Sequence, residues 1–281
     1  MPKRKKGEPA RNPPGLVQWV RDGLSRRGRY KQSGLAIALN LHPSQVVRIL
    51  QDKRRILPAE VPMIAQYLEM DVPADVTAFH FIPPCSPIRA KEVPAGDAWL
   101  HEVKFDGYRV QAHKVGSRVV IYSGNGHNFT GRFPSIAQLL HELPAKAAVL
   151  DGEVVASNAD GSPNFARLHV RWARPGAIHL WAFDLLVFNG RDLRPQPLVK
   201  RQALLQVLLE RFGCPAISLS ETFEDGMALL RTAEQRGLEG VVSKRRDAPY
   251  RSGECRDWRK VKTVAWREAN RERWRLFEKV R

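Results

Sequence analysis

The string EVKFDGYR at positions 102–109 constrains the fold of this chain more than any other feature of its sequence. Its Asp-Gly pair separates two segments in which apolar and polar residues alternate, 99–105 and 108–115. An Asp-Gly pair between alternating segments is typical of the tight turn of a β-hairpin. We therefore predict that Lys104 lies at a strand end, where an amine can reach a cavity. Taken alone, the string fits a solvated lysine beside an ordinary turn better than a catalytic lysine.

The same alternation recurs along the chain after residue 98, interrupted by segments with helical periodicity. Strands are predicted at 99–105, 108–115, 118–123, 148–156, 178–188, 216–220, 239–245 and 258–263. Helices are predicted at 133–143, 164–172, 198–212, 223–236 and 266–279. The fourth of these helices has a capping box formed by Thr222 and Asp225. The pattern predicts an α+β domain at 99–265, with antiparallel sheets and flanking helices, followed by a basic C-terminal helix at 266–281.

A helical pattern occupies residues 15–70. Pro43 and Ser44 divide its best segment into two short helices, because the residue before a proline leaves the helical region and a serine can cap the next helix. The arrangement resembles the helix-turn-helix of phage-repressor-like proteins, whose second helix reads the major groove of DNA. Apolar residues such as Val47 are predicted to pack between the helices. The side chains predicted to face outward and contact DNA are Gln45, Arg48, Arg54 and Arg55. The alternative is a small helical bundle with a solvated basic face.

The chain of 281 residues carries 46 Lys and Arg against 29 Asp and Glu, a formal net charge of +17. Such an excess favours a polyanionic partner through counterion release, and nucleic acid is the first candidate. No apolar stretch approaches the roughly 20 residues that a membrane span needs, and no signal peptide is visible. We therefore expect a cytoplasmic, nucleoid-associated protein without a membrane partner. Three widely spaced cysteines indicate neither a disulfide framework nor a zinc site.

Two further segments are expected to lie outside the packed domains. The tail at 1–14 is rich in Lys, Arg and Pro, cannot bury a core and is expected to be disordered. The segment 71–98 contains five prolines and is predicted to be a linker that leads into the α+β domain.

Five strings follow Lys104 in a suggestive order. They are Asp151-Gly152-Glu153, Phe183-Asp184-Leu185-Leu186, Glu239-Gly240-Val241-Val242-Ser243-Lys244, Tyr250-Arg251-Ser252-Gly253 and Trp258-Arg259-Lys260-Val261-Lys262. In this order and spacing they resemble the motifs of covalent nucleotidyltransferases, namely ATP-dependent DNA ligases, RNA ligases and mRNA capping enzymes. Within that group the chain is most similar to bacterial ATP-dependent DNA ligases of the end-joining type. The resemblance covers roughly residues 79–281, and five ordered motifs are far more specific than one.

The resemblance implies that Lys104 forms a covalent lysine–AMP intermediate from ATP, releases pyrophosphate and so enables the sealing of 5′-phosphate/3′-hydroxyl breaks in DNA during repair or recombination. A free lysine amine, with a pKa of about 10.4, is protonated and non-nucleophilic at pH 7. Arg109, Lys260 and Lys262 would lower that pKa by like charge and would hold the phosphates. The i, i+2 spacing places the two later lysines on one strand face with Trp258. An exposed edge strand blunted by lysines is the alternative.

The remaining candidates serve the nucleotide and a metal ion. By the resemblance, Glu153 would contact the ribose or assist the metal, Phe183 would stack on adenine, and Glu102 would complete the ATP site. Taken singly, these residues also fit a turn carboxylate and a core aromatic. Mg²⁺ (or Mn²⁺) takes oxygen ligands from one or two carboxylates plus phosphate and water, and Glu239 is the first candidate ligand and Asp106 the second. ATP is the expected nucleotide, and the sequence leaves GTP open.

Two features depart from the family pattern. An arginine is usual after the first hairpin, where it would contact the 5′-phosphate of the nick, but this chain has Gly124 at that place. Only 19 residues follow Lys262, so no C-terminal OB-fold is expected, and a protein partner could supply the missing DNA clamp. Two alternatives therefore stay open: a DNA-binding regulator or accessory factor with a decayed ligase-like domain, and an RNA ligase.

Overall fold

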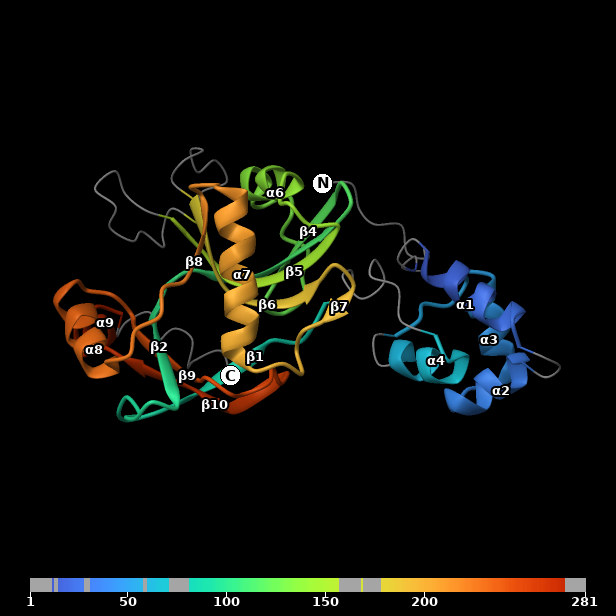
Figure 1. Ribbon diagram of the computed structural model, residues 1–281, viewed down its shortest axis with the longest axis horizontal. Coiled ribbons are helices and arrows are strands. Elements are labelled where there is room, and N and C mark those ends of the chain that lie inside the picture. Colours follow the sequence, from blue (N-terminus) through green and yellow to red (C-terminus); the bar gives the residue numbers. More distant parts are fainter. Residues whose placement is uncertain are drawn as a thin grey trace. The chain divides into compact units, whose positions relative to one another are not determined.

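The computed structural model describes residues 12, 15–27, 31–57, 60–70, 81–156, 168 and 178–270. The chain divides into two compact units, 1–81 and 82–281 (Figure 1). Apart from Asn12 and Leu168, the predicted tail at 1–14 and the predicted helix at 164–172 lie outside the described residues. The C-terminal helix is described only as far as residue 270.

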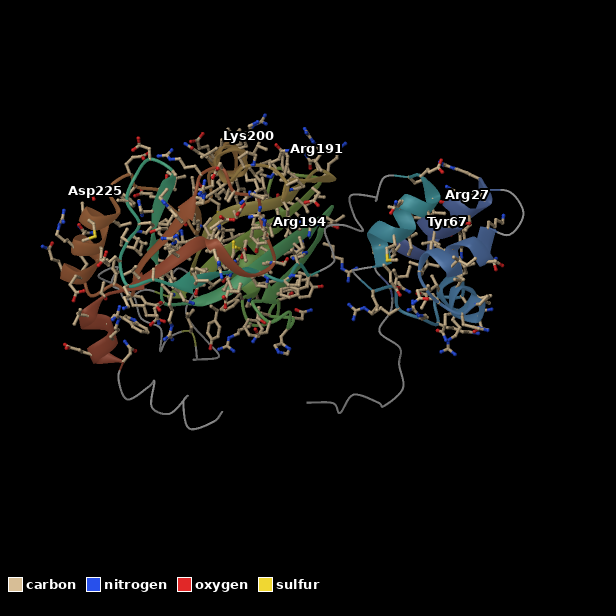
Figure 2. The ribbon with its side chains drawn as sticks, turned by 90° about the horizontal axis from the view of Figure 1, so that it is seen from below. Arg27, Tyr67, Arg191, Arg194, Lys200 and Asp225 are labelled. Carbon is tan, nitrogen blue, oxygen red and sulfur yellow. The ribbon has the colours of Figure 1, made fainter. Side chains whose placement is uncertain are left out.

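The described residues of the first unit form four short helices: α1 (Leu16–Ser25), α2 (Lys31–Ala38), α3 (Pro43–Leu50) and α4 (Glu60–Leu68). Their apolar faces meet in one core, which includes Leu16, Leu35, Val46, Ile49 and Ile64. Outside the core, Arg27 lies 4.6 Å from the ring centre of Tyr67 and so links the end of α1 to α4 (Figure 2). The two helices predicted around Pro43 are α2 and α3, and they pack on each other.

Helix α3 differs from its prediction in two details. Pro43 is its first residue and His42 is its N-cap in place of Ser44, because proline at the first helical position needs no backbone N–H. This start sets the phase of the helix. Ile49 is buried and Val47, which was predicted to be buried, is 41% exposed.

The predicted DNA-contacting side chains of this unit differ in how they are held. Arg48 and Arg55 are exposed and Gln45 is partly exposed. Arg54 does not point outward as predicted, because its guanidinium donates to Glu60 at 2.6 and 3.0 Å and the side chain is only 18% exposed. The pair raises the pKa of Arg54 and anchors the segment after α3 to α4.

Two sheets form the second unit (Figure 1). The four-stranded sheet has the order β1 (Cys85–Arg89), β10 (Gly253–Lys262), β9 (Gly240–Arg245), β2 (Trp99–Lys104). The six-stranded sheet has the order β4 (Arg118–Ser123), β3 (Tyr108–Val115), β5 (Ala147–Ala156), β6 (Ile178–Phe188), β7 (Arg191–Asp192), with β8 (Ile217–Leu219) also paired to β6. The pairs β1–β10 and β6–β8 are parallel and the other described pairs are antiparallel. The predicted α+β architecture with antiparallel sheets and flanking helices is confirmed.

Helices cover one face of each sheet. α6 (Pro134–His141) and α7 (Leu198–Phe212) bury Leu140, Leu205 and Leu208 in the main core, against strands of the six-stranded sheet. α8 (Gly226–Gln235) packs Leu229 against Val241 and Val261 of the four-stranded sheet. α9 (Val264–Ala269) follows directly on β10. No helix in the described part of the chain has the length and apolar character needed to cross a membrane.

The Asp106-Gly107 pair does not form the predicted hairpin. β2 pairs with β9 in one sheet and β3 pairs with β4 and β5 in the other, so residues 105–107 carry the chain from sheet to sheet. The connection lies so close to β5 that a Cβ atom on Gly107 would be 2.3 Å from the carbonyl oxygen of Val154. Glycine is therefore required here for close approach and not for a hairpin turn.

Strand β1 lies inside the segment predicted to be a linker, and residues 82–98 belong to the second unit. The prolines of this segment argued against a strand in the sequence. β1 is, however, an edge strand whose register shifts directly after Pro87, and a missing backbone N–H is tolerated at such a position. As a result β10 lies between β1 and β9, so the alternative of an exposed, lysine-blunted edge strand is wrong.

Helix α8 begins later than predicted. The capping box with Thr222 does not form, and Asp225 is itself the N-cap, accepting from the Ala228 amide at 2.8 Å. The reason lies in the preceding backbone, because Phe223 and His101 exchange two backbone hydrogen bonds and hold this segment extended.

Candidate active site

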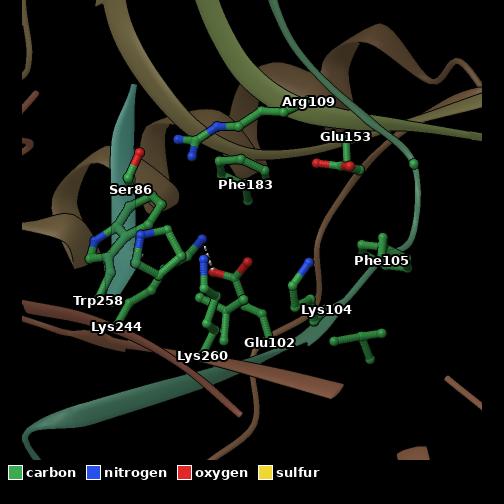
Figure 3. A pocket seen from close by; sticks show the side chains of 14 residues that line it. Ser86, Glu102, Lys104, Phe105, Arg109, Glu153, Phe183, Lys244, Trp258 and Lys260 are labelled. Carbon is green, nitrogen blue, oxygen red and sulfur yellow. Dashed lines mark hydrogen bonds and ion pairs between the residues drawn. The ribbon is translucent and has the colours of Figure 1, made fainter. Parts of the chain in front are cut away.

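A cavity of about 360 Å³ opens between the two sheets (Figure 3). Strands β1, β2, β9 and β10 of one sheet and β3, β5 and β6 of the other contribute to its walls. Most of the residues predicted for the ATP site line this cavity: Glu102, Lys104, Arg109, Glu153, Phe183 and Lys260. Residues more than a hundred positions apart in sequence are therefore brought to one place.

The register of the four-stranded sheet joins Lys104 to Lys262. Gly240, the first residue of β9, pairs with Lys104 of β2 on one side and with Lys262 of β10 on the other. Glu239 directly precedes Gly240, so its carboxylate meets both ammonium groups, with Lys104 Nζ at 2.8 Å from Oε2 and Lys262 Nζ at 2.7 Å from Oε1. Gly240 itself has no room for a Cβ atom, which would be 2.0 Å from the Val261 carbonyl oxygen.

Lys260 lies on the same face of β10 as Lys262, as the spacing predicted. Trp258 shares this face and lines the cavity with Lys260, whereas Val261 is buried on the opposite face. Burial lowers the pKa of Lys260, and the positive charges of Lys104 and Lys262 lower it further. Burial also lowers the pKa of Lys262, against the opposing effect of Glu239. The cavity thus concentrates positive charge that a polyphosphate can neutralise.

Arg109 is held more firmly than the sequence suggested. Its guanidinium makes a bidentate pair with the fully buried Asp151, at 3.1 and 2.7 Å, and donates to the carbonyl oxygen of Cys85 at 2.7 Å. The hydroxyl of Tyr250 donates to the same carboxylate at 2.6 Å. Although burial opposes the charge, Asp151 raises the pKa of Arg109. Arg109 is therefore a fixed donor whose charge is already shared.

A β-bulge directs Phe183 into the cavity. Asp151 pairs with Asp184 and Gly152 with Ala182, so Phe183 is the extra residue on β6. Its ring stands edge-on to Trp258, with centroids 6.0 Å apart. The bulge also turns Asp184 inward, where it forms a buried pair with Arg201 of α7.

Lys244 and Glu102 form a second buried pair beside these rings (Figure 3). The Lys244 ammonium donates to Glu102 at 2.7 Å and lies 4.2 and 4.4 Å from the ring centres of Phe183 and Trp258. Gln202 of α7 donates to the same carboxylate at 2.8 Å. Burial raises the pKa of Glu102, and Lys244 and Gln202 act against that rise. The Glu102 carboxylate is thus bound to protein groups at the cavity wall.

Glu153 has a strongly perturbed carboxylate that lines the cavity. Burial raises its pKa to about 7, Lys104 and Arg109 oppose the rise, and the negative charges of Glu239 and Asp151 add to it. A carboxyl group with this pKa exchanges protons near neutral pH and gains most from a cation placed beside it.

The predicted metal ligands differ in position. Glu239 lies between Lys104 and Lys262, and Asp106 lies in the connection between the sheets; neither side chain is among those that line the cavity. The described residues contain no cluster of three or more metal-binding side chains. Mg²⁺ bound through one or two carboxylates, phosphates and water needs no such cluster. The carboxylates of Glu239 and Glu153, which interact electrostatically, fit such an ion, and Asp106 as a second ligand stays a prediction.

Sequence reasoning missed five residues that hold the site together: Asp151, Gln202, Lys244, Tyr250 and Trp258. Four of them lie inside the quoted strings, so the signal was present, but their roles depend on partners more than 40 positions away, such as Phe183 for Trp258. Gln202 gave no signal, because a glutamine in an amphipathic helix is ordinarily solvated.

Comparisons with known proteins agree with this geometry. Residues 62–262 match the family model described as ATP dependent DNA ligase domain. The multifunctional non-homologous end joining protein LigD of Pseudomonas aeruginosa is 37% identical over 174 residues, which cover 61% of this chain and 21% of that protein. A probable DNA ligase of Sorangium cellulosum is 38% identical over 173 residues, covering 57% of this chain and 32% of that protein. The chain thus matches about a fifth to a third of the length of these relatives.

Two solved structures share the fold. The ligase domain of M. tuberculosis LigD has a TM-score of 0.57 at 29% identity, covering 64% of this chain and 60% of that one. A mycobacterial DNA ligase D complexed with ATP and MES has a TM-score of 0.56 at 30% identity, covering 66% and 62%. The family match extends over more than half of the chain and includes the strands that build the cavity. The chain therefore belongs to the ATP-dependent DNA ligase domain family.

Proposed function

We propose that this chain is an ATP-dependent DNA ligase that acts through a covalent adenylate on Lys104. The observation that carries the proposal is the position of the Lys104 ammonium, which reaches the cavity and donates to Glu239 at 2.8 Å among Arg109, Lys260 and Lys262. A carboxylate at this distance can accept the ammonium proton, after which the amine is nucleophilic.

The proposed first step is a displacement at the α-phosphorus of ATP. The lone pair of Lys104 Nζ forms a nitrogen–phosphorus bond while the bond from that phosphorus to the bridging oxygen breaks, and pyrophosphate leaves with the bond electrons. The proton lost by Lys104 passes to Glu239 or to water. Arg109, Lys260 and Lys262 then stabilise the charge that develops on the phosphate oxygens.

The cavity supports specific roles in ATP binding. Phe183 offers a ring for the adenine and Glu153 a carboxyl group for the ribose hydroxyls. Mg²⁺, held by Glu239 with Glu153 nearby, would supply charge neutralisation for the polyphosphate. Glu102 and Arg109 act through their fixed side chains, Glu102 by holding Lys244 beside Phe183 and Arg109 by donating to phosphate.

We further propose that the substrate is duplex DNA with a nick or break, and that the N-terminal unit binds DNA as a helix-turn-helix. The formal charge of +17 and the exposed Arg48 and Arg55 support that role. Gln45 at the start of α3 is placed to reach base edges if α3 enters the major groove. Arg54 is a weaker candidate, because Glu60 already binds its guanidinium.

Self-labelling with α-labelled ATP and Mg²⁺ tests the first step. We expect one label per chain that survives denaturing electrophoresis, is released by added pyrophosphate and is absent in Lys104→Ala. Lys200→Ala is the matched control, since Lys200 is an exposed lysine at the start of α7 (Figure 2) and should label normally. The absence of label on the unmodified protein would refute the proposal.

Sealing requires a separate measurement. Nicked DNA and nicked RNA duplexes with one fluorescent strand are compared, and we expect joining of the DNA nick with little joining of RNA. Labelled protein that transfers no AMP to either nick would favour the decayed-domain alternative, for which Gly124 at the usual arginine position is the specific reason.

A further inference from the structure

Three aromatic rings form a column at the edge of the cavity. Phe105 stacks on Trp181 with ring centroids 5.2 Å apart and an angle of 8° between the planes. On Trp181 also lies His179, with centroids 4.4 Å apart and an angle of 31°. Phe105 lines the cavity directly after Lys104, and all three side chains are partly exposed. The column is therefore a π surface that begins beside the nucleophile.

The strand register explains why the column faces the cavity. Trp181 of β6 is directly opposite Glu153 of β5, and His179 is opposite Val155, so these side chains share one face of the sheet. The intervening Leu180 is buried in the main core on the other face. The column is thus not part of the core that holds the sheet to α6 and α7.

The chemistry of His179 suits a stacking surface. Burial lowers the pKa of this imidazole, which favours its neutral form. Its Nε2 atom is shielded from solvent and has no hydrogen-bond partner among the described residues. A neutral imidazole stacked on Trp181 extends the π surface on which a heteroaromatic ligand can stack.

We propose that the column formed by Phe105, Trp181 and His179 receives a nucleobase that flanks the strand break. This inference rests on the proposed function, because the nucleotides next to the break must come close to Lys104 when AMP is transferred. Aromatic side chains bind bases without regard to sequence, since every base has a π face. The cations of the cavity would meet the phosphates while the column meets the base. The adenine of ATP is the competing occupant, and Phe183 already offers a separate ring for it.

The test measures binding to nicked duplexes by fluorescence anisotropy, with either normal or abasic nucleotides on both sides of the nick. Removing the flanking bases should weaken binding of the unmodified protein about 5- to 150-fold, the range for loss of one base–aromatic stack. In Trp181→Leu this penalty should fall to about two-fold or less, and in Trp181→Phe most of it should remain. Phe223→Leu, which removes an exposed aromatic ring that does not line the cavity, should keep the full penalty.

The inference is overturned if removal of the flanking bases weakens binding equally in the unmodified protein and in Trp181→Leu. It is also overturned if their removal does not weaken binding of the unmodified protein. It is also overturned if Trp181→Leu slows self-labelling by ATP and leaves the abasic penalty unchanged, because the column then holds adenine. Should Trp181→Leu not fold, His179→Ala at the outer end of the column gives the same comparison. Anisotropy needs no catalysis, so a chain that takes no label from ATP refutes the ligase proposal and still permits this test.

Discussion

Asp151→Asn tests how strongly burial determines the contribution of an arginine–aspartate pair to the stability of this fold. The described residues of the second unit contain four such pairs with the same bidentate geometry, in which Nε and Nη2 of the arginine each donate to one carboxylate oxygen at 2.7–3.1 Å. Three of them, all except Arg245–Asp247, are compared. They differ in the exposed fractions of the arginine and aspartate side chains, which are 0% and 0% for Arg201–Asp184, 20% and 0% for Arg109–Asp151, and 36% and 37% for Arg194–Asp192. Geometry is thus held nearly constant while burial varies.

The expected cost follows from what the substitution leaves behind. Asp151→Asn removes the charge that compensates Arg109 in a buried setting and weakens the bond from Tyr250, so we expect a loss of about 3–5 kcal/mol in the free energy of unfolding. Asp184→Asn should cost at least as much, since Arg201 has no access to solvent. Asp192→Asn leaves Arg194 without its partner, but water already reaches this arginine, so a loss of only about 0–1 kcal/mol in the free energy of unfolding is expected.

Urea unfolding followed by tryptophan emission measures these differences. Every tryptophan except Trp19 belongs to the second unit, so the signal reports mainly on that unit. With an m-value of about 2 kcal/mol/M, the midpoint should fall by about 1.5–2.5 M for Asp151→Asn and by about 0.5 M or less for Asp192→Asn.

A double variant checks the cause. Arg109→Met in the Asp151→Asn background removes the uncompensated cation, so part of the lost stability should return. The reasoning is wrong if Asp192→Asn costs as much as Asp151→Asn, or if the double variant is less stable than Asp151→Asn alone.

Three further predictions concern single side chains of the site. The pKa of Glu153 in the folded protein, about 7, exceeds its ordinary value of 4.5, so ionisation of this carboxyl group destabilises the fold as the pH rises from about 4.5 through 7. Glu153→Gln should therefore stabilise the protein by at most about 3 kcal/mol at pH 8 and very little at pH 4.5. Equal shifts in thermal unfolding at both pH values would contradict this. Lys244→Met leaves the buried Glu102 carboxylate without its cation and should lower the free energy of unfolding in urea at pH 8 by about 3–5 kcal/mol. Adding Glu102→Gln should restore part of this stability, and no restoration would show that the uncompensated charge of Glu102 is not the cause. A Cβ atom at Gly124 would meet only ordinary contacts, 3.7 Å from Arg109 Cβ, so the backbone accepts a side chain there. Gly124→Arg should raise nick sealing about 10- to 150-fold, and an unchanged rate would show that the missing arginine is not limiting.

The strands of the second unit were predictable because their alternation is local. β2, β3, β4 and β6 follow their predicted ranges closely, as does α7. Pairing was not predictable in the same way. The Asp106-Gly107 pair is compatible with a tight turn, but β2 pairs with β9, some 140 positions away, and not with its sequence neighbour β3. Local turn chemistry permits a hairpin and cannot exclude a partner from elsewhere in the chain.

The site was predictable to the extent that its residues carry charge in ordered strings. Lys104, Glu239, Lys260 and Lys262 come together as the motif order implied. What the strings could not give is the pairing of charges within the fold. Arg109 pairs with Asp151, which lies 42 positions away, and the buried Lys244 lies close to the rings of Phe183 and Trp258; both arrangements depend on contacts between strands that are distant in sequence.

The connection at 105–107 has a mechanical consequence. It joins the strand that bears the nucleophile to the strand that bears Arg109, and the chain allows the α-carbons of Lys104 and Tyr108 to separate by no more than about 14 Å. This short tether fixes the width of the cavity at its reactive end by covalent bonds. At the end of the cavity by Ser86 and Trp258 the two sheets are joined by a hydrogen bond instead, from Arg109 of β3 to the carbonyl oxygen of Cys85 in β1. Widening of the cavity for nucleotide entry or pyrophosphate release would therefore have to break hydrogen bonds at that end, whereas at the other end the covalent connection limits how far the lysine can move from the strand of Arg109.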